Sequence, residues 1–293
     1  MTVVDALSAE STSRFADLPS GLRLHYHQAG DPAADTIVML HGGGPGASAW
    51  SNFGRNLLAL SDRFHVLAVD QPGFGRSDKP TSYNKPFWTF SADVTAELLG
   101  QLGVAKAHFV GNSLGGGTAV RFALDHPQLA GRLVLMAPGG LGLNIISADP
   151  TEGIKKLYSF AAPPGPSKEK LADFLRTLVF DQSMITDELI AERYQFAADP
   201  ETLRSMAAMG ATFTDPSTFE QGMLWREAYR LRQRVLLIWG REDRVNPLDG
   251  AFVGLKLIPR AELHVFGKCG HWAMLEKFDE FNRLTADFLT GGL

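Results

Sequence analysis

The segment Gly111-Asn112-Ser113-Leu114-Gly115 places a serine between two glycines, in the pattern G-x-S-x-G. An apolar run at 107–110 precedes it, and Gly116, Gly117 and a helical stretch follow. A sharp strand–turn–helix of this kind lifts the serine hydroxyl above the edge of a sheet and points the next helix N-terminus at it. The pattern alone is common, but this context favours Ser113 as a nucleophile over a plain glycine-rich turn.

A serine is a weak nucleophile until a base takes its proton and an acid orients that base. In this kind of fold the expected chain order is serine, acid, histidine. Asp243 follows the apolar run at 235–239, and His271 follows the run at 262–266. We therefore predict Ser113 as nucleophile, His271 as base and Asp243 as the orienting acid, all at one sheet edge.

Other reactive side chains have plainer explanations. Glu242 adjoins Arg241 like a solvated charge, and Asp249 stands at a helix start. Asp70 precedes a glycine-rich turn and is expected to be structural, while Cys269 is a lone cysteine of the kind that is usually inert. The remaining histidines lack metal-ligand spacing and are expected in the core or at the surface: His25, His27, His41, His65, His108, His126 and His264. No metal and no cofactor is expected.

A second glycine-rich loop, His41-Gly42-Gly43-Gly44-Pro45-Gly46, follows the apolar run at 36–40. Unobstructed backbone N–H groups there, with the N–H of Leu114, are suited to an oxyanion hole. Gly43 and Gly44 are the donor and its support, in an order that the sequence leaves open, and His41 is expected to organise the loop. The loop matches neither a phosphate loop nor a dinucleotide fingerprint.

The elements that must position these groups alternate along the chain. Apolar runs at 36–40, 65–69, 107–110, 132–137, 235–239 and 262–266 are typical of strands buried on both faces of a parallel sheet. Helices are expected between them at 51–60, 91–102, 115–126, 247–258 and 276–289, and an alternating strand at 22–29. This order predicts an α/β fold with a mostly parallel sheet flanked by helices.

One interval contains helix starts but no convincing strand. Asp149-Pro150, Ser167, Thr186, Asp199-Pro200 and Asp215-Pro216 are predicted N-terminal caps. We expect residues 140–230 to form a helical cap inserted into a core of residues 1–139 and 231–293. Apolar cap residues that could line a pocket beneath it are Leu157, Phe160, Met206, Met209, Phe213, Met223 and Trp225.

The amino-acid composition limits the classes of binding partner that are expected. The 293 residues have a formal net charge of −4, so no overall basic field attracts nucleic acid or an anionic membrane. Residues 1–14 do not resemble a signal peptide, and no apolar run reaches the roughly 20 residues of a spanning helix. A soluble cytoplasmic protein is expected. Arg193 shares a helix face with Leu189, Ile190 and Ala197, where it either pairs with a neighbouring carboxylate or binds an anion.

Motifs at 41–46, 70–75, 111–117, 240–245 and 270–272 together resemble the meta-cleavage product hydrolases of the α/β-hydrolase fold, over nearly the whole chain. Such enzymes hydrolyse a carbon–carbon bond in vinylogous 1,5-diketones made by extradiol ring cleavage. Segments 11–15, 133–136 and 229–232 are most similar to the steroid-catabolic branch, which implies an opened-ring seco-steroid substrate. The open alternatives are a biphenyl-type dienoate hydrolase, a carboxylesterase and a non-catalytic binding protein.

The resemblance also implies a substrate-binding set, in which Asn52, Asn112, Arg193 and Trp272 contact the carboxylate and oxo group of an anionic dienoate. It implies ketonisation of the substrate followed by hydrolysis, with a covalent serine intermediate and serine-activated water both open. It further implies a homo-oligomer, a dimer or higher, that needs no cofactor.

Overall fold

An eight-stranded, mostly parallel sheet organises the chain in this computed structural model, which describes residues 7–142, 145 and 147–292. Its strand order is β1-β2-β4-β3-β5-β6-β7-β8, in which β2 runs antiparallel to both of its neighbours and the other neighbouring pairs are parallel. The strands are β1 Ser13–Asp17, β2 Arg23–Ala29, β3 Thr36–Leu40, β4 His65–Val69, β5 Ala107–Asn112, β6 Ala130–Met136, β7 Val235–Gly240 and β8 Ala261–Phe266. The predicted α/β architecture is thereby confirmed.

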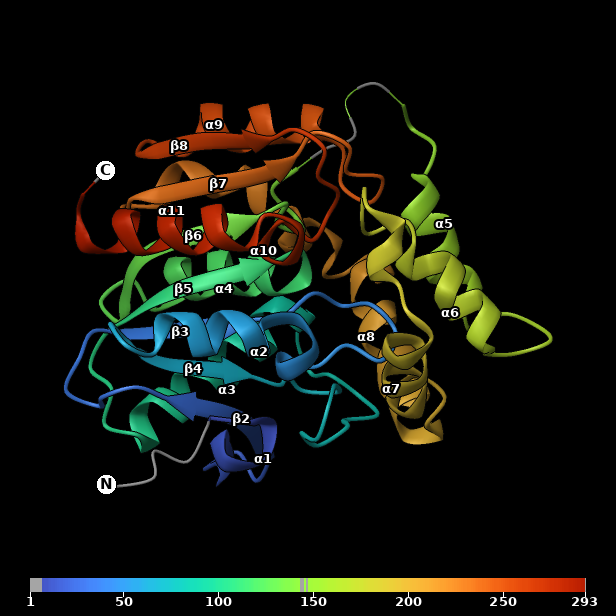
Figure 1. Cartoon of the computed structure of the whole chain (residues 1–293), viewed down its shortest axis with the longest axis horizontal. Helices are drawn as coiled ribbons and strands as arrows, with labels where there is room; N and C mark the ends of the chain where they lie inside the picture. Colours follow the sequence, from blue (N-terminus) through green and yellow to red (C-terminus); the bar gives the residue numbers. More distant parts are fainter. Residues whose placement is uncertain (1–6, 143–144, 146, 293) are drawn as a thin grey trace.

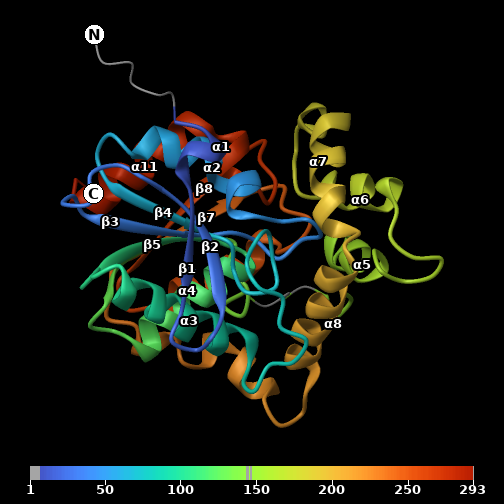
Figure 2. The same cartoon turned by 90° about the horizontal axis from the view of Figure 1, so that it is seen from below.

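Helices cover both faces of the sheet (Figures 1 and 2). One face packs against α2 (Ala49–Leu60), α10 (Ala273–Glu276) and α11 (Phe278–Thr290). The other packs against α3 (Phe87–Gln101), α4 (Leu114–Asp125) and α9 (Ala251–Leu257), while the short α1 (Ala9–Thr12) lies beside β2. Because β3, β4 and β7 are buried along their whole length, their continuous apolar sequences have no polar alternation.

The last strand departs from the prediction. β8 was expected to be buried on both faces, yet of its residues only Phe266 is buried, and Val265 is 38% exposed. β8 pairs with β7 alone, so it is an edge strand that the flanking helices do not fully cover.

Between β6 and β7 the described residues contain helices and no strand. The helices are α5 Glu152–Ser159, α6 Lys168–Leu175, α7 Asp187–Ala197 and α8 Pro200–Thr214, followed by 3₁₀ turns at Phe219–Gly222, Leu224–Arg226 and Ala228–Arg230. They lie beyond the carboxyl ends of the parallel strands, at the right of Figure 1. Residues 143, 144 and 146 of the predicted cap, and 1–6 and 293 of the predicted core, lie outside the described residues.

Three of the predicted caps are confirmed and two are wrong. The side chains of Ser167, Thr186 and Asp199 accept hydrogen bonds from the first turns of α6, α7 and α8. Thr151, rather than Asp149, caps α5, because its hydroxyl accepts the N–H of Ile154. Asp215 ends α8 instead of starting a helix: its backbone N–H still bonds Ala211, and its carboxylate closes a turn with Ser217.

Other errors concern boundaries. The helix predicted at 91–102 starts earlier, at Phe87, because Phe87 and Trp88 are buried against the core. The helix predicted at 276–289 is divided into α10 and α11, and that at 247–258 begins as a 3₁₀ turn at Leu248–Gly250. β1 and α1 were not predicted. No helix among the described residues is long and apolar enough to cross a bilayer.

Candidate active site

Ser113 stands at the junction of β5 and α4 in a backbone conformation that side chains rarely adopt, with φ 52° and ψ −113°. Its N–H donates to the carbonyl of Met136 at 2.9 Å, and its own carbonyl accepts the N–H groups of Gly117 and Gly139. Strain of this kind persists only where surrounding contacts enforce it. The turn predicted from the sequence is therefore present and is held from both sides.

The flanking glycines are sterically required. A Cβ on Gly111 would lie 2.6 Å from the carbonyl oxygen of Gly115, and one on Gly115 would lie 2.1 Å from that of Leu40. Both distances are below any ordinary contact, so no side chain fits. The close approach of α4 to β3 and β5 is what presents Ser113 at the sheet edge.

The predicted base and acid are directly bonded. Nδ1 of His271 lies 2.6 Å from Oδ2 of Asp243, and both side chains are buried. The other oxygen, Oδ1, accepts the N–H groups of Val245 at 2.7 Å and Asn246 at 2.9 Å. With the carboxylate fixed as an acceptor, His271 donates from Nδ1 and keeps Nε2 for a substrate or nucleophile.

Ser113 and His271 line one cavity of about 520 Å³. Within the described residues no hydrogen bond joins the Ser113 hydroxyl to the imidazole. Such bonds are often long in ligand-free enzymes and shorten when substrate binds. The geometry thus brings the three predicted residues to one place, with the acid–base pair already formed.

The rival acids have other partners. Glu242 accepts the N–H of Cys269 at 3.0 Å and pairs with Arg241. Asp70 is buried and bonds Nδ1 of His25 at 2.7 Å, so it organises the turn after β4. Asp249 accepts the N–H of Ile145 at the surface.

The glycine-rich loop at 41–46 forms another wall of the cavity, through Gly42, Gly43 and Gly44. A Cβ on Gly43 would lie 2.8 Å from the side chain of Leu114, so the loop packs directly on the residue after the nucleophile. His41 anchors the loop, since its Nε2 accepts the N–H of Gln71 at 3.0 Å. Burial lowers the pKa of His41 and keeps its imidazole neutral for that bond.

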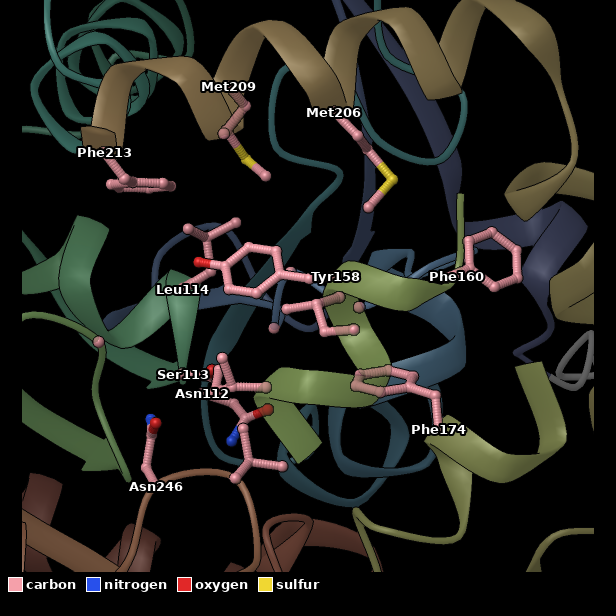
Figure 3. Close-up of a pocket in the computed structure, with 18 of the residues that line it drawn as sticks. Asn112, Ser113, Leu114, Tyr158, Phe160, Phe174, Met206, Met209, Phe213 and Asn246 are labelled. Carbon is pink, nitrogen blue, oxygen red and sulfur yellow. The ribbon is translucent and has the colours of Figure 1, made fainter. Parts of the chain in front are cut away.

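The cap supplies the cavity roof. Figure 3 shows Met206, Met209 and Phe213 of α8 pointing toward Ser113 and Asn112. Six of the seven predicted lining residues are present: Leu157, Phe160, Met206, Met209, Phe213 and Met223. Trp225 is not among them, because its side chain packs against the core on the α3–α4 face of the sheet.

Arg193 is a buried cation on α7, only 1% exposed. Its Nε and Nη2 donate to the carbonyl of Pro45 at 3.3 and 3.1 Å, and its guanidinium lies over the ring of Trp272. Nη1 is buried without a partner among the described residues. Burial lowers the pKa of Arg193 to about 10, against a raising effect of Glu192, so the group remains charged at neutral pH. An unpaired donor on a buried charge marks a place for an anion.

Two asparagines complete this end of the cavity. Nδ2 of Asn112 donates to the carbonyl of His271 at 3.2 Å, which ties β5 to residues 267–272, the base loop. Oδ1 of Asn112 is buried without a partner in the described part of the chain. Nδ2 of Asn52 donates to the carbonyl of Ser48 at 3.2 Å. Asn52, Asn112, Arg193 and Trp272, the predicted substrate-binding set, all line the cavity. No group of three or more metal-ligating side chains occurs in the described part of the chain.

The comparisons with known proteins agree with this geometry. Residues 35–278 match the family described as alpha/beta hydrolase fold. The chain is 40% identical to the 2-hydroxy-6-oxo-6-phenylhexa-2,4-dienoate hydrolase of Burkholderia cepacia, over 98% of this chain and 99% of that one. It belongs to the meta-cleavage product hydrolase family.

Two further relatives support the assignment. The 2-hydroxy-6-oxononadienedioate/2-hydroxy-6-oxononatrienedioate hydrolase of Comamonas testosteroni is 40% identical over 98% of this chain and 99% of its own length. The solved meta-cleavage product hydrolase of Pseudomonas fluorescens IP01 superposes with a TM-score of 0.83 at 34% identity, covering 96% of this chain and 98% of that one.

The site of this family member also has residues that sequence reasoning missed. Asn246 lines the cavity, and the indole N–H of Trp88 donates to the carbonyl of Leu114 at 3.0 Å. Glu276 joins the base loop to the cap, because its carboxylate accepts the N–H groups of Gly270 and Phe180. Only the position of Asn246, three residues after the predicted acid, offered a signal.

Proposed function

We propose that this chain hydrolyses the carbon–carbon bond between C5 and C6 of a 2-hydroxy-6-oxo-dienoate, with Ser113, His271 and Asp243 as catalytic residues. The observation that carries the proposal is the buried Arg193, whose Nη1 has no partner among the described residues, in the cavity that Ser113 and the Asp243-bonded His271 also line. An ester hydrolase needs only the triad, whereas a dienoate brings a carboxylate that Arg193 matches.

Binding orients the substrate. The guanidinium of Arg193 and the amides of Asn52 and Asn112 hold the carboxylate and the neighbouring oxygen, over the ring of Trp272. The similarity to dienoate hydrolases along the whole chain supports this role. The ketone at C6 then lies toward Ser113.

Ketonisation comes first. The enol hydroxyl at C2 gives up its proton, and C5 gains one through His271. The product is a ketone that can later accept the electron pair of the broken bond. Without this step the departing group would be an unstabilised carbanion.

Acyl transfer follows. Oγ of Ser113 adds to C6 while its proton passes to His271, whose imidazolium Asp243 stabilises. The N–H of Leu114 and that of Gly43 or Gly44 stabilise the oxyanion. The C5–C6 bond breaks, its electron pair forms the enolate of the departing dienoate, and His271 returns the proton. Water, activated by His271, then releases the acid from Ser113.

The acyl half of the substrate is a separate question. The relatives named for phenyl and nonadienedioate substrates favour the aromatic type over the seco-steroid type that the sequence motifs suggested. A seco-steroid substrate therefore stays a prediction, as do the cytoplasmic location and a homo-oligomer of two or more chains. We also propose residues 140–230 as the lid over a core of residues 1–139 and 231–293.

A stopped-flow absorbance assay of a yellow phenyl or seco-steroid dienoate tests the function. The wild type should bleach the dienoate, Ser113→Ala should bind it without releasing acid, and Arg193→Ala should lose most turnover. An acetate ester is the control substrate. Cleavage of the ester with no decay of either dienoate would establish the carboxylesterase alternative instead.

A further inference from the structure

A second cavity, of about 230 Å³, adjoins the first at the β6–β7 side of the site. The two cavities share the lining residues Gly139, Ile154, Val245 and Asn246. The carbonyl of Ser113 accepts the N–H of Gly139 at 2.8 Å, so the shared wall begins beside the nucleophile. The second cavity is thus a continuation of the reaction site, which the mechanism above does not use.

The two ends of the combined space lie on opposite sides of Ser113. Arg193 bonds Pro45 in the loop after β3, whereas the side chain of Asn246 bonds Ala137 at the end of β6. β5, which leads to Ser113, lies between β3 and β6 in the sheet. In Figure 3, Ser113 lies between Asn246 and Phe174. Phe174 marks the Arg193 end of the cavity, because a Cβ on Gly44 would lie 2.7 Å from the ring of Phe174 and 3.5 Å from Nη2 of Arg193. A dienoate bound at Arg193 therefore directs its acyl half toward Asn246.

Asn246 is rigidly held and still has hydrogen-bonding capacity. Its N–H donates to Asp243 at 2.9 Å, its carbonyl accepts the indole N–H of Trp239 at 2.8 Å, and its Nδ2 donates to Ala137 at 2.7 Å. A carboxamide has a second N–H and two acceptor sites on Oδ1 beyond that single side-chain bond. Asn246 is partly buried and lines both cavities beside Ile154 and Val245. A ligand with a polar atom at this wall can therefore pair with these groups.

We infer that Asn246 and the second cavity form a polar extension of the acyl subsite, which takes an acyl group longer than one phenyl ring and bearing a ketone or hydroxyl oxygen. This inference rests on the proposed function. An unsubstituted phenyl ring has no atom that can bond the carboxamide, whereas a fused-ring acyl group with ketones has both the length and the oxygen.

The experiment compares two dienoates, one with a 6-phenyl group and one derived from a seco-steroid, and measures the ratio of their kcat/KM values. Asn246→Val removes the polar group. Gly142→Leu fills the second cavity, where a Cβ on Gly142 meets nothing nearer than 3.6 Å and the backbone is unstrained. Each variant should shift the ratio about tenfold against the seco-steroid dienoate, the effect of one lost hydrogen bond or contact.

Phe174→Leu is the matched control, because it alters the dienoate end that both substrates share and should change both kcat/KM values by the same factor. Melting curves of all variants report folding. Hydrolysis of both dienoates with a ratio that neither Asn246→Val nor Gly142→Leu alters would overturn the inference alone. No decay of either dienoate with wild-type enzyme would overturn the proposed function and this inference with it.

Discussion

The guanidinium carbon of Arg193 lies 5.2 Å from the ring centre of Trp272, which joins a cap helix to the residue after the predicted base. A cation over an aromatic face is attracted to it, more strongly where water is excluded. The same guanidinium bonds Pro45 in the glycine-rich loop at 41–46. Arg193, on the cap helix α7, thus contacts both the glycine-rich loop at 41–46 and the base loop.

Replacement of Arg193 should lower the hydrolysis of a dienoate more than the hydrolysis of a neutral ester. Arg193→Ala should lower kcat/KM for a dienoate about a hundredfold, and Arg193→Lys about tenfold, because lysine keeps the charge but loses the planar fork. Steady-state kinetics with a dienoate and a neutral acetate ester measure both. An equal loss on the two substrates would contradict a carboxylate-binding role.

Asp243→Asn should leave the fold intact and remove most catalysis. The remaining Oδ1 still accepts the N–H groups of Val245 and Asn246, but an amide donor facing His271 favours the wrong tautomer. A loss of kcat of about 10⁴-fold is expected from the same change in serine proteases. Turnover within tenfold of wild type, in a variant with an unchanged melting curve, would refute this acid assignment.

Glu276 should be a positioning residue. Oε1 accepts the N–H groups of Phe180 and Asp181, at 2.7 and 2.9 Å, and Oε2 accepts that of Gly270 at 2.6 Å. Glu276→Gln keeps one oxygen, so either the cap or the base loop loses its acceptor. Unfolding free energy should fall by about 1–2 kcal/mol, and kcat more than KM should change.

The exposed Glu280, on the following helix, provides the matched control for this substitution. Glu280→Gln removes the same charge without touching either loop, so denaturant titration and kinetics should both stay near wild type. Identical behaviour of the two variants would show that charge, rather than the bridge, is responsible.

The single cysteine should not react with thiol reagents in the folded protein. Cys269 is fully buried, and burial raises the pKa of its thiol, so little reactive thiolate forms. Ellman's reagent should label it only after guanidinium unfolds the chain. Rapid labelling of native protein would mean that the base loop opens readily.

His27 should make stability fall in mild acid. Burial, followed by the nearby His25 and Arg76 and opposed by Asp70, lowers its pKa to about 4. The unfolded chain takes up this proton near pH 6.5, whereas the folded protein does so only near pH 4, so stability is lost as pH falls between these values. The loss attributable to His27 is up to about 3 kcal/mol.

Urea titrations across this pH range test the effect of His27. His27→Gln removes the titrating group, so the slope of unfolding free energy against pH should be shallower in the variant. Parallel curves for the two proteins would assign the acid sensitivity to other groups.

The sequence alone determined the parallel strands of the sheet and the order of reactive groups along its edge. Continuous apolar runs identified β3 and β4 at their observed ends, because strands buried on both faces have no polar alternation to blur their limits. The glycines around Ser113 predicted a turn whose tightness comes from local sterics. Since parallel strands end at a common edge, Asp243 and His271 were predicted to meet there.

Only the tertiary structure decided which neighbours each group has. Asp149 and Asp215 had the local pattern of helix N-caps. In the structure Thr151 caps α5 in place of Asp149, and Asp215 stands at the end of α8. Asn246 and Glu276 owe their roles to partners on distant segments, such as Ala137 and Phe180.

The physical reason is the range of the interactions. Apolar periodicity, glycine conformations and caps act within a few residues and can be read along the chain. The charge of Arg193 is written in the sequence, but its burial against Pro45 and Trp272 exists only because α7 crosses the carboxyl edge of the sheet. Folding buried this cation and left its Nη1 without a partner among the described residues, which is the basis for proposing it as an anion site.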